Sequence, residues 1–303
     1  MFTISVDENS EGKRLDTFLA EVSENLSRSK IQALIKSGAV KINGSEKKAS
    51  YILREDDKIE MTMPEIEEIK IEPENIPLEV VWEDENMLVV NKPSGMLTHP
   101  TTQERSGTLV NALLYKFGDN LSDLNGELRR GILHRLDRNT SGLLMIAKNN
   151  AAHEFLAQEI KNHTLTKKYR AIVNGNYKED FEEINLPIGR HPKVTHKMAV
   201  VPDGKESRTV VKVLERFKDA TYLELTLITG RTHQIRVHLS HKKHPVYNDT
   251  LYGGTGKAAT EEQVLQSYYL KFTKPFSNEI IELEIPPDEK ITKVLNYLKN
   301  KGK

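Results

Sequence analysis

The sequence contains no cysteine among its 303 residues. Disulfide bonds, thiolate metal sites and cysteine nucleophiles are therefore excluded, and the absence fits a cytoplasmic protein. No window approaches the roughly 18 consecutive apolar residues that a membrane-spanning helix needs. The first eleven residues are polar and acidic, so they lack the basic end and apolar core of a signal peptide. We expect a cytoplasmic protein that does not insert into a membrane.

The chain also lacks net charge, because its 44 basic side chains balance 44 acidic ones. The two signs are unevenly distributed along the sequence. Residues 1–60 carry 10 basic and 11 acidic side chains, and residues 61–86 carry 1 and 9. Residues 87–303 carry 33 basic and 24 acidic side chains, together with all ten histidines. This excess of positive charge suits a polyanionic partner, although a solvated basic surface without a partner is equally compatible with it.

The length favours about two domains. An acidic segment, 61–85, contains three prolines, and its pattern IEEIKIEPENIP is not typical of a helix. Such a segment is typical of a linker. We predict a first domain at 1–62, an acidic linker at 63–77 and a second domain at 78–303.

The first domain has the pattern of a small module. A first helix is indicated by apolar residues at helical spacing, Leu15, Phe18, Leu19 and Val22. A second helix, capped by Ser27, is expected to run to about Ser37 and to end at Gly38. A short strand with Val40 and Ile42 follows, and Asn43–Gly44 predicts a hairpin turn. Two short helices and a hairpin bury little core, which suits a binding module better than an enzyme.

This segment resembles a known RNA-binding domain. KRLDTFLAE, LSRSKIQALIKSGAVKING and LREDDKIEM resemble, in order, the small domain named after ribosomal protein S-four. In that family the second helix and the following turn present basic residues to RNA phosphates. Carried over, the resemblance assigns this role to Arg28, Lys30, Lys36, Lys41 and Lys47. Such contacts supply salt-dependent affinity and little sequence choice, and a solvated helix face is the alternative.

The second domain alternates strand and turn signals. Strands rich in Val, Ile, Tyr and Thr are expected at 78–84, 85–93, 143–149, 169–175, 209–217, 221–230 and 280–286. Helices are fewer, at 108–116, 151–162, 234–240 and near the C-terminus. We therefore predict an α+β protein in which a large mixed, mainly antiparallel sheet is flanked by helices.

One segment, 131–148, is unusually polar before it becomes apolar. The strand LLMIAK is preceded by Ser141–Gly142, which reads as a turn, and by a polar loop that contains Asp137. Arg135 and Arg138 flank this aspartate, and they would keep it ionised if they are also close in space. An ionised carboxylate can act as a nucleophile or a base. On composition alone, an aspartate that caps a turn is the simpler interpretation.

The motif HRLDRNTSGL in this segment resembles the signature of the RluA-type pseudouridine synthases, whose catalytic aspartate stands in HRLD. Four further segments resemble family motifs in family order: VVNKPSGMLTHP (89–100), KKYRAIVNG (167–175), LITGRTHQIRVHL (227–239) and HPVYND (244–249). With the S-four-type domain in front, the layout is similar to the RluD-like branch. One stretch, 265–275, departs from the family pattern because it lacks two expected histidines.

The resemblance implies an isomerase that detaches uracil from ribose, turns it and rejoins it through carbon 5. Asp137 would attack the sugar or otherwise trigger cleavage of the glycosidic bond. Arg236 would hold that carboxylate charged and oriented, and Tyr169 would stack on the target base. A surface ion pair and a core aromatic are the alternatives for these two residues. The atoms are conserved in the reaction, so neither a cofactor nor a metal is expected.

The target uridine must leave the RNA stack, which costs a few kcal/mol. By resemblance, Arg135 fills the vacated space, since a guanidinium plane can stack where a base was. His134 is placed beside it on the RNA side and is expected to orient the loop, and Arg231 is expected at a phosphate or the edge of the site. Lys92 and Pro93 are expected to shape the wall of the cleft.

The layout favours large-subunit ribosomal RNA or a ribosome precursor as the partner, with transfer RNA as the alternative, and a monomer is expected. Two other functions compete. The closely spaced histidines His233, His238, His241 and His244 suggest a metallohydrolase. Their intervals, however, do not match the pattern of two metal-binding histidines on one helix face with an adjacent glutamate. A non-catalytic RNA-binding protein would keep its function without Asp137.

Overall fold

The computed structural model describes residues 2–23, 26, 28–62, 70–256 and 260–301. The chain divides into two compact units, residues 1–68 and 69–303, and each is described by itself below. No helix among the described residues is long and apolar enough to cross a membrane.

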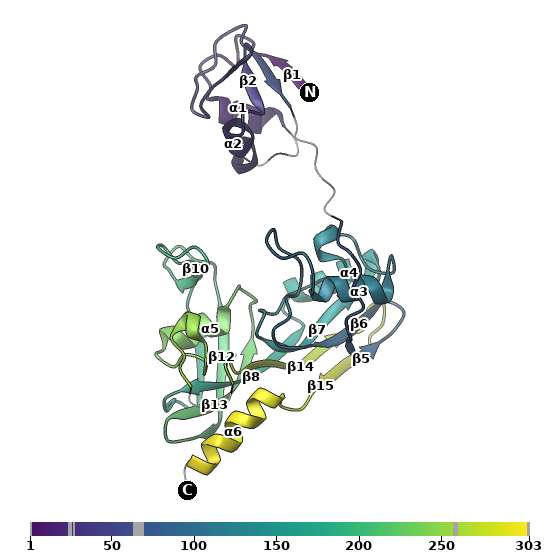
Figure 1. Cartoon of the computed structure of the whole chain (residues 1–303), viewed down its shortest axis with the longest axis vertical. Coiled ribbons are helices and arrows are strands. Elements are labelled where there is room, and N and C mark those ends of the chain that lie inside the picture. Colours follow the sequence, from purple (N-terminus) through teal and green to yellow (C-terminus); the bar gives the residue numbers. More distant parts are fainter. Residues whose placement is uncertain (1, 24–25, 27, 63–69, 257–259, 302–303) are drawn as a thin grey trace. The chain divides into compact units, whose positions relative to one another are not determined.

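The first unit is a four-stranded antiparallel sheet with two helices (Figure 1). Its elements are β1 (Phe2–Ser5), α1 (Leu15–Val22), α2 (Arg28–Lys36), β2 (Val40–Ile42), β3 (Ser45–Glu46) and β4 (Lys58–Met61), and the sheet order is β1-β4-β2-β3. The predicted hairpin is confirmed, because β2 pairs with β3 around Asn43 and Gly44, which both have positive φ. Ser27, the expected cap of α2, lies outside the described residues.

The core of the first unit contains the apolar residues that the helical spacing predicts, except Val22 at the end of α1, which is 46% exposed. Leu15 and Leu19 of α1 and Ile31 of α2 are fully buried, and they pack with Val40 and Ile42 of β2. The three-residue pattern of β2 is buried, exposed, buried. Lys41 therefore points away from this core, on the opposite face of the strand.

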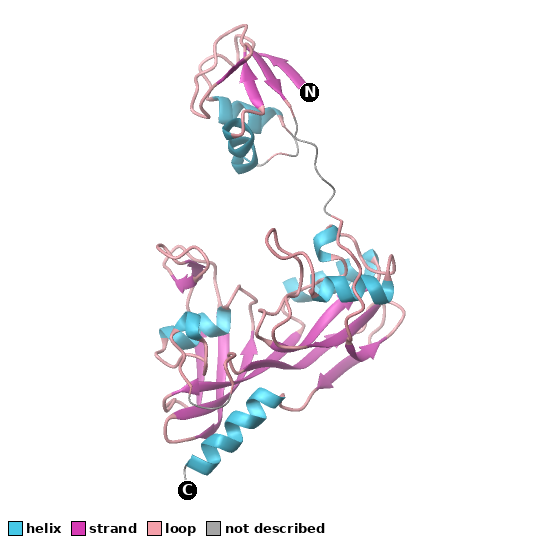
Figure 2. Ribbon diagram, viewed as in Figure 1, coloured by secondary structure: helices cyan, strands magenta, loops and turns pink. Residues whose placement is uncertain are grey.

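The second unit is built on one nine-stranded mixed sheet (Figure 2). Its strands are β5 (Glu79–Glu83), β6 (Met87–Lys92), β7 (Ser141–Ala147), β8 (Thr166–Asn174), β9 (Phe181–Asn185), β12 (Arg208–Arg216), β13 (Ala220–Leu227), β14 (Leu265–Thr273) and β15 (Ile280–Glu284). The order is β5-β6-β7-β14-β8-β13-β12-β9, with β15 beside β14. Every pairing is antiparallel except that of β7 with β14. The predicted mixed, mainly antiparallel sheet is confirmed.

Helices cover both faces of this sheet. They are α3 (Leu109–Phe117), α4 (Asn150–Lys161), α5 (Gln234–His241) and α6 (Glu289–Lys301). Leu88 and Val90 of β6 pack in one cluster with α3, whereas Met87 and Val89 pack in another with Leu156 of α4. Since successive side chains of a strand point to opposite faces, α3 and α4 lie against different faces. A separate hairpin, β10 (Ile188–Arg190) with β11 (Met198–Val200), packs near α5.

The predicted Ser141–Gly142 turn is wrong, because both residues belong to β7. Ser141 and Gly142 are the positions at which β7 pairs with the parallel strand β14. A Cβ on Gly142 would stand 2.0 Å from the main-chain oxygen of Ser267, and Gly142 has a φ of +116°. The glycine therefore marks a close approach of two backbones rather than a change of chain direction.

Candidate active site

A cavity of about 450 Å³ opens on the second unit. Four stretches line it, together with Leu265 of β14: the polar loop before β7, the end of α4 with the residues that follow it, the start of β8, and the segment from the end of β13 into α5. The charged or potentially charged side chains in its wall are His134, Arg135, Asp137, Lys161, His163, Lys167, Arg231, His233 and Arg236. Among these described residues Asp137 is the one carboxylate, so the wall carries a clear excess of positive charge. A phosphate-bearing ligand would complement it.

Asp137 and Arg236 meet in this cavity although 99 residues separate them. Nη1 of Arg236 donates to Oδ2 of Asp137 at 2.8 Å, and the Asp137 side chain keeps 17% of its surface exposed. The turn at Asp137 is closed by its main-chain oxygen, which accepts from the N–H of Thr140 at 3.0 Å. The carboxylate is therefore not used as a turn cap. It is accessible, oriented and available for chemistry at the cavity wall.

Arg236 is held by a second carboxylate on its other side. Its Nε and Nη2 donate to the two oxygens of Asp249 at 2.7 and 2.9 Å, and its guanidinium lies 4.9 Å from the ring centre of Tyr252. Burial alone would lower the pKa of Arg236, but the hydrogen bonds and charges of Asp249 and Asp137 outweigh it and raise that pKa. This fork-shaped pairing fixes the guanidinium plane, so the remaining nitrogen, Nη1, points to Asp137.

The turn that leads into α5 is pinned by another buried side chain, Gln234. Its Oε1 accepts from Thr229 Oγ1 and from the N–H of Arg231, and its Nε2 donates to the Arg208 carbonyl. His233, at the start of the helix, adopts a left-handed conformation with φ of 56°. These contacts determine where α5 begins, and thereby where Arg236 stands.

Tyr169 reaches the cavity from β8. Its ring is 6% exposed, and it belongs to the large core cluster of the unit. Burial raises the pKa of the Tyr169 hydroxyl, a hydrogen bond with Ser267 lowers it, and the charge of Asp137 raises it further. The hydroxyl therefore stays protonated at neutral pH. The structure thus places Tyr169, Asp137 and Arg236 at one cavity.

The two arginines that flank Asp137 in the sequence do not pair with its carboxylate. The sequence analysis expected them to keep Asp137 ionised only if they also lay close to it in space, and this condition is not met. Arg138 turns to Glu104, at 2.5 Å, and to the Gly95 carbonyl. Arg135 is exposed at the cavity wall and forms no hydrogen bond or ion pair with any described residue. Successive side chains of an irregular loop point in different directions, so sequence adjacency did not place these guanidinium groups on the carboxylate.

His134 and Arg231 both line the cavity. The Nε2 atom of His134 accepts from the N–H of Met145 at 3.2 Å, which ties the loop to β7. Burial and the nearby charge of Lys167 lower the pKa of His134 to about 3, so its ring is neutral. Arg231 is exposed, and its Nε donates to the Glu206 carbonyl at 3.0 Å.

The main chain that carries Asp137 is held by two lysines outside the cavity, one buried and one half-buried. Lys92 is fully buried, and its Nζ donates to the carbonyls of Pro93, Met96 and Arg138 at 2.7, 2.8 and 3.1 Å. Burial is the main reason that the pKa of Lys92 falls to about 7. Neither Lys92 nor Pro93 lines the cavity, so they support the loop and do not form the wall that we expected of them.

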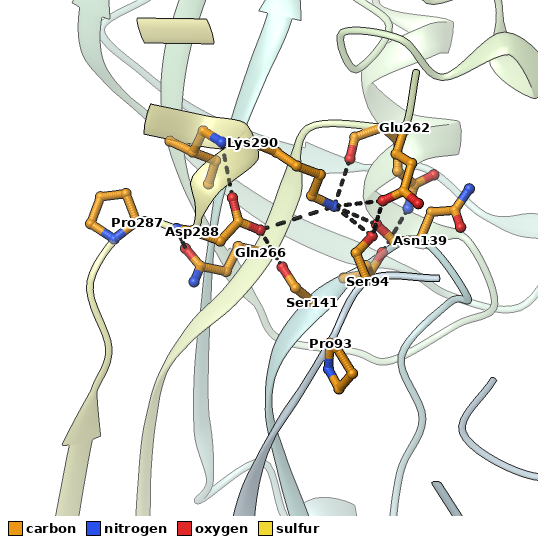
Figure 3. A network of polar contacts seen from close by, with 12 residues as sticks. Pro93, Ser94, Asn139, Ser141, Glu262, Gln266, Pro287, Asp288 and Lys290 are labelled. Carbon is orange, nitrogen blue, oxygen red and sulfur yellow. Dashed lines mark hydrogen bonds and ion pairs between the residues drawn. The ribbon is translucent and has the colours of Figure 1, made fainter. Parts of the chain in front are cut away.

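The second of these lysines, Lys290, comes from the first turn of α6 (Figure 3). Its Nζ donates to Ser94 Oγ at 2.8 Å and to the carbonyls of Asn139 and Gln263 at 2.9 and 3.2 Å. Asp288 accepts from Ser141 Oγ at 2.5 Å and caps the same helix by accepting from the N–H of Ile291. The C-terminal helix is thereby fixed to the residues that follow Asp137.

The five basic residues of the first unit that we expected at RNA, Arg28, Lys30, Lys36, Lys41 and Lys47, are all exposed. Arg28 is also engaged within the protein, because its guanidinium donates to the buried carboxylate of Asp16 at 3.1 Å. Arg14 and Gln32 share that carboxylate, and together with Arg28 they lower its pKa. Arg28 thus presents only part of its donor capacity to a partner.

Of the four histidines that suggested a metal site, three form separate contacts and the fourth, His241, is exposed. His233 Nδ1 lies 2.8 Å from the Tyr252 hydroxyl. His238 is buried between Thr209 Oγ1 and the Leu186 carbonyl. His244 Nδ1 lies 2.9 Å from the Asn174 carbonyl. Within the part of the chain that the structure describes, no group of three or more His, Asp or Glu side chains is arranged to hold a metal ion.

Comparison with known proteins identifies the family. The model of the RNA pseudouridylate synthase family matches residues 86–241, and that of the S4 domain matches residues 13–59. The chain belongs to the RNA pseudouridylate synthase family. It is therefore an RNA pseudouridine synthase with an S4 domain, and RNA is its partner.

Relatives match nearly the whole chain. An uncharacterized RNA pseudouridine synthase of Bacillus subtilis is 42% identical over 99% of this chain and 98% of its own length. The ribosomal large subunit pseudouridine synthase D of Zymomonas mobilis is 36% identical, with 99% and 98% covered. Among solved structures, human RNA pseudouridylate synthase domain containing 1 aligns with a TM-score of 0.56 at 26% identity, over 74% of this chain and 95% of that one.

Several residues of the site were missed by the sequence analysis. Asp249 stands in HPVYND, a segment that we matched to the family without giving any of its residues a role. Tyr252 and Lys290 lie in no motif, and only the folded chain brings them to Arg236 and to the loop after Asp137. Lys167 lines the cavity two residues before Tyr169. A lysine in a strand beside a matched aromatic was the one available signal for it.

Proposed function

We propose that this synthase converts specific uridines of large-subunit ribosomal RNA to pseudouridine through Asp137, after flipping each target base out of the RNA stack. The observation that carries the mechanism is the accessible Asp137 carboxylate, fixed at 2.8 Å by Arg236 in a cavity of positive charge. The substrate is supported by relatives named ribosomal large subunit pseudouridine synthase D in Zymomonas mobilis and Haemophilus ducreyi.

In this mechanism each residue acts on one part of the flipped nucleotide. Asp137 acts at the ribose as nucleophile or base, while Arg236 keeps it ionised and oriented. Tyr169 packs against the uracil and holds it while the ring turns. Arg135, exposed and without a described partner, stacks in the space that the base has left. Arg231 and the exposed lysines of the first unit hold RNA phosphates. The enzyme acts as a cytoplasmic monomer without a cofactor.

The proposal is tested by mapping pseudouridines in a strain that lacks the gene, with carbodiimide labelling and primer extension on total RNA. We expect specific pseudouridines to disappear from large-subunit ribosomal RNA and to return with the wild-type gene, but not with Asp137→Asn. Loss confined to transfer RNA would refute the ribosomal substrate. Unchanged pseudouridines in all RNA would refute the function itself.

A further inference from the structure

A buried lysine in the cavity, Lys167, has no part in the chemistry described above. Its side chain comes from β8, and the residue is 8% exposed. No acceptor among the described residues lies within hydrogen-bond distance of its Nζ, so the ammonium is unpaired. Buried lysines are rare unless they are paired, because an ammonium group loses much of its hydration when it is buried. An unpaired ammonium at a substrate cavity therefore indicates that the ligand supplies the acceptor.

The neighbouring groups cannot supply that acceptor. The Nε2 atom of His134 already accepts from Met145, so in the neutral ring the other nitrogen carries the proton. Asp137, the one carboxylate among the described residues of the wall, forms its ion pairs with Arg236 and His233 and none with Lys167. Across the cavity, Nζ lies 3.6 Å from the point where a Cβ of Gly230 would stand. Burial lowers the pKa of Lys167 to about 8, which leaves the ammonium mostly protonated at neutral pH.

The position of Lys167 indicates which part of a nucleotide it would meet. Lys167 and Tyr169 are two residues apart on one face of β8, about 7 Å from each other along the strand. The exposed lining residues Lys161 and His163, which precede β8 in the chain, mark the rim of the cavity. A nucleotide that enters base first has its ring at Tyr169 and its phosphate nearer the rim. Lys167, about 7 Å from Tyr169 along the strand, is therefore the cavity residue that we assign to the phosphate.

We propose that Lys167 binds the phosphate group attached to the ribose of the flipped uridine and so holds the nucleotide in the cavity. This inference rests on the proposed function, and it adds a substrate-binding residue to it. Ammonium N–H groups and phosphate oxygens form charge-assisted hydrogen bonds, which are stronger than neutral ones. Because the contact forms only when the base is flipped, it stabilises the reactive state more than the initial complex.

The test measures tritium release from transcribed large-subunit ribosomal RNA that carries [5-³H]uridine, since joining the base through carbon 5 frees that hydrogen. We expect Lys167→Met to lower the rate at saturating RNA by about 10- to 100-fold, the value of a hydrogen bond to a charged group. Lys167→Arg, which keeps the charge and the donors, should recover the rate to within about fivefold. Lys212→Met, at an exposed position of β12 outside the cavity wall, is the matched control and should stay within about twofold of wild type.

A Lys167→Met rate equal to that of wild type would overturn the inference and leave the proposed function standing. A wild-type enzyme that releases no tritium from any RNA would refute the proposed function instead. Thermal unfolding supplies a second readout that does not depend on activity. Removing an unpaired buried charge should raise the melting temperature of Lys167→Met by about 2–6 °C. A fall would show that Lys167 has a partner within the protein, and would overturn the inference.

The phosphate assignment is tested with uridine, uridine 5′-monophosphate and uridine 3′-monophosphate as inhibitors of tritium release. We expect one monophosphate to inhibit the wild-type enzyme at a concentration at least about tenfold lower than uridine does. This preference should vanish in Lys167→Met and persist in Lys212→Met. A preference unchanged in Lys167→Met, or equal or absent inhibition of wild type by all three compounds, would overturn the assignment to phosphate.

Discussion

Replacing Asp249 by asparagine should separate the support of Arg236 from the chemistry of Asp137. The substitution preserves the shape of the side chain but removes the charge that Arg236 meets at 2.7 and 2.9 Å. Asp249 is 2% exposed, and breaking a buried ion pair by removing one partner costs about 3–5 kcal/mol. Asparagine keeps one acceptor oxygen for Arg236, so we expect the loss of folding stability to be at the lower end of this range, about 3 kcal/mol. In a unit of this size that corresponds to a melting temperature lower by about 6–12 °C.

The effect on catalysis follows from the same contacts. Arg236 loses a charged partner that fixes its plane, so its Nη1 no longer points steadily at Asp137. We expect the rate of tritium release at saturating RNA to fall by about 10- to 100-fold, with RNA binding within about twofold of wild type. Asp180→Asn is the matched control, because Asp180 pairs with Arg216 at 2.6 Å on the exposed surface, where such pairs contribute little. A normal rate for Asp249→Asn with a lowered melting temperature would refute the positioning role.

Three further predictions concern the loop and the sheet that carry Asp137. Gly142→Ala should lower the melting temperature by several degrees in calorimetry, since its Cβ would stand 2.0 Å from the Ser267 carbonyl oxygen; an unchanged value would show that β14 can move aside. Lys290→Met should reduce tritium release about tenfold without weakening RNA binding, because three hydrogen bonds to the loop network are lost; equal losses in both would contradict this. For Lys167, the folded pKa of about 8 lies below the ordinary 10.5. Its cost to stability is therefore present below pH 8 and disappears as pH rises to 10.5, so the melting temperatures of wild type and Lys167→Met should converge over that range.

The sheet and the small first unit could be predicted because their signals are local. Alternating Val, Ile and Thr residues define most strands, and Asn43–Gly44 defines a hairpin through two positive φ angles. The strand β14 shows the limit of this approach. Its pairing with β7 depends on a glycine, Gly142, whose role is to admit a backbone 125 residues further along the chain. A Ser-Gly pair before an apolar run carries the same local pattern as a turn, so only the tertiary structure separates the two interpretations.

The residues of the site also fall into those that could be predicted from the sequence and those that could not. Asp137, Tyr169 and Arg236 stand in motifs, so a resemblance could name them together. The groups that position them could not be named from the sequence, because they act across the fold. Asp249 meets Arg236 after the chain leaves α5, and Lys290 reaches the loop after Asp137 from the C-terminal helix. Local charge was misleading in this respect, since Arg138 adjoins Asp137 in sequence but pairs with Glu104.

The role of Asp137 is tested most directly by tritium release from RNA carrying [5-³H]uridine, measured for wild type and Asp137→Asn alongside RNA binding by both. The asparagine keeps the volume of the side chain and an acceptor for Arg236, but it is neither a nucleophile nor a base. We predict that Asp137→Asn binds the RNA within about twofold of wild type and releases no tritium. An Asp137→Asn enzyme that still forms pseudouridine would show that the carboxylate is not the group that performs the reaction.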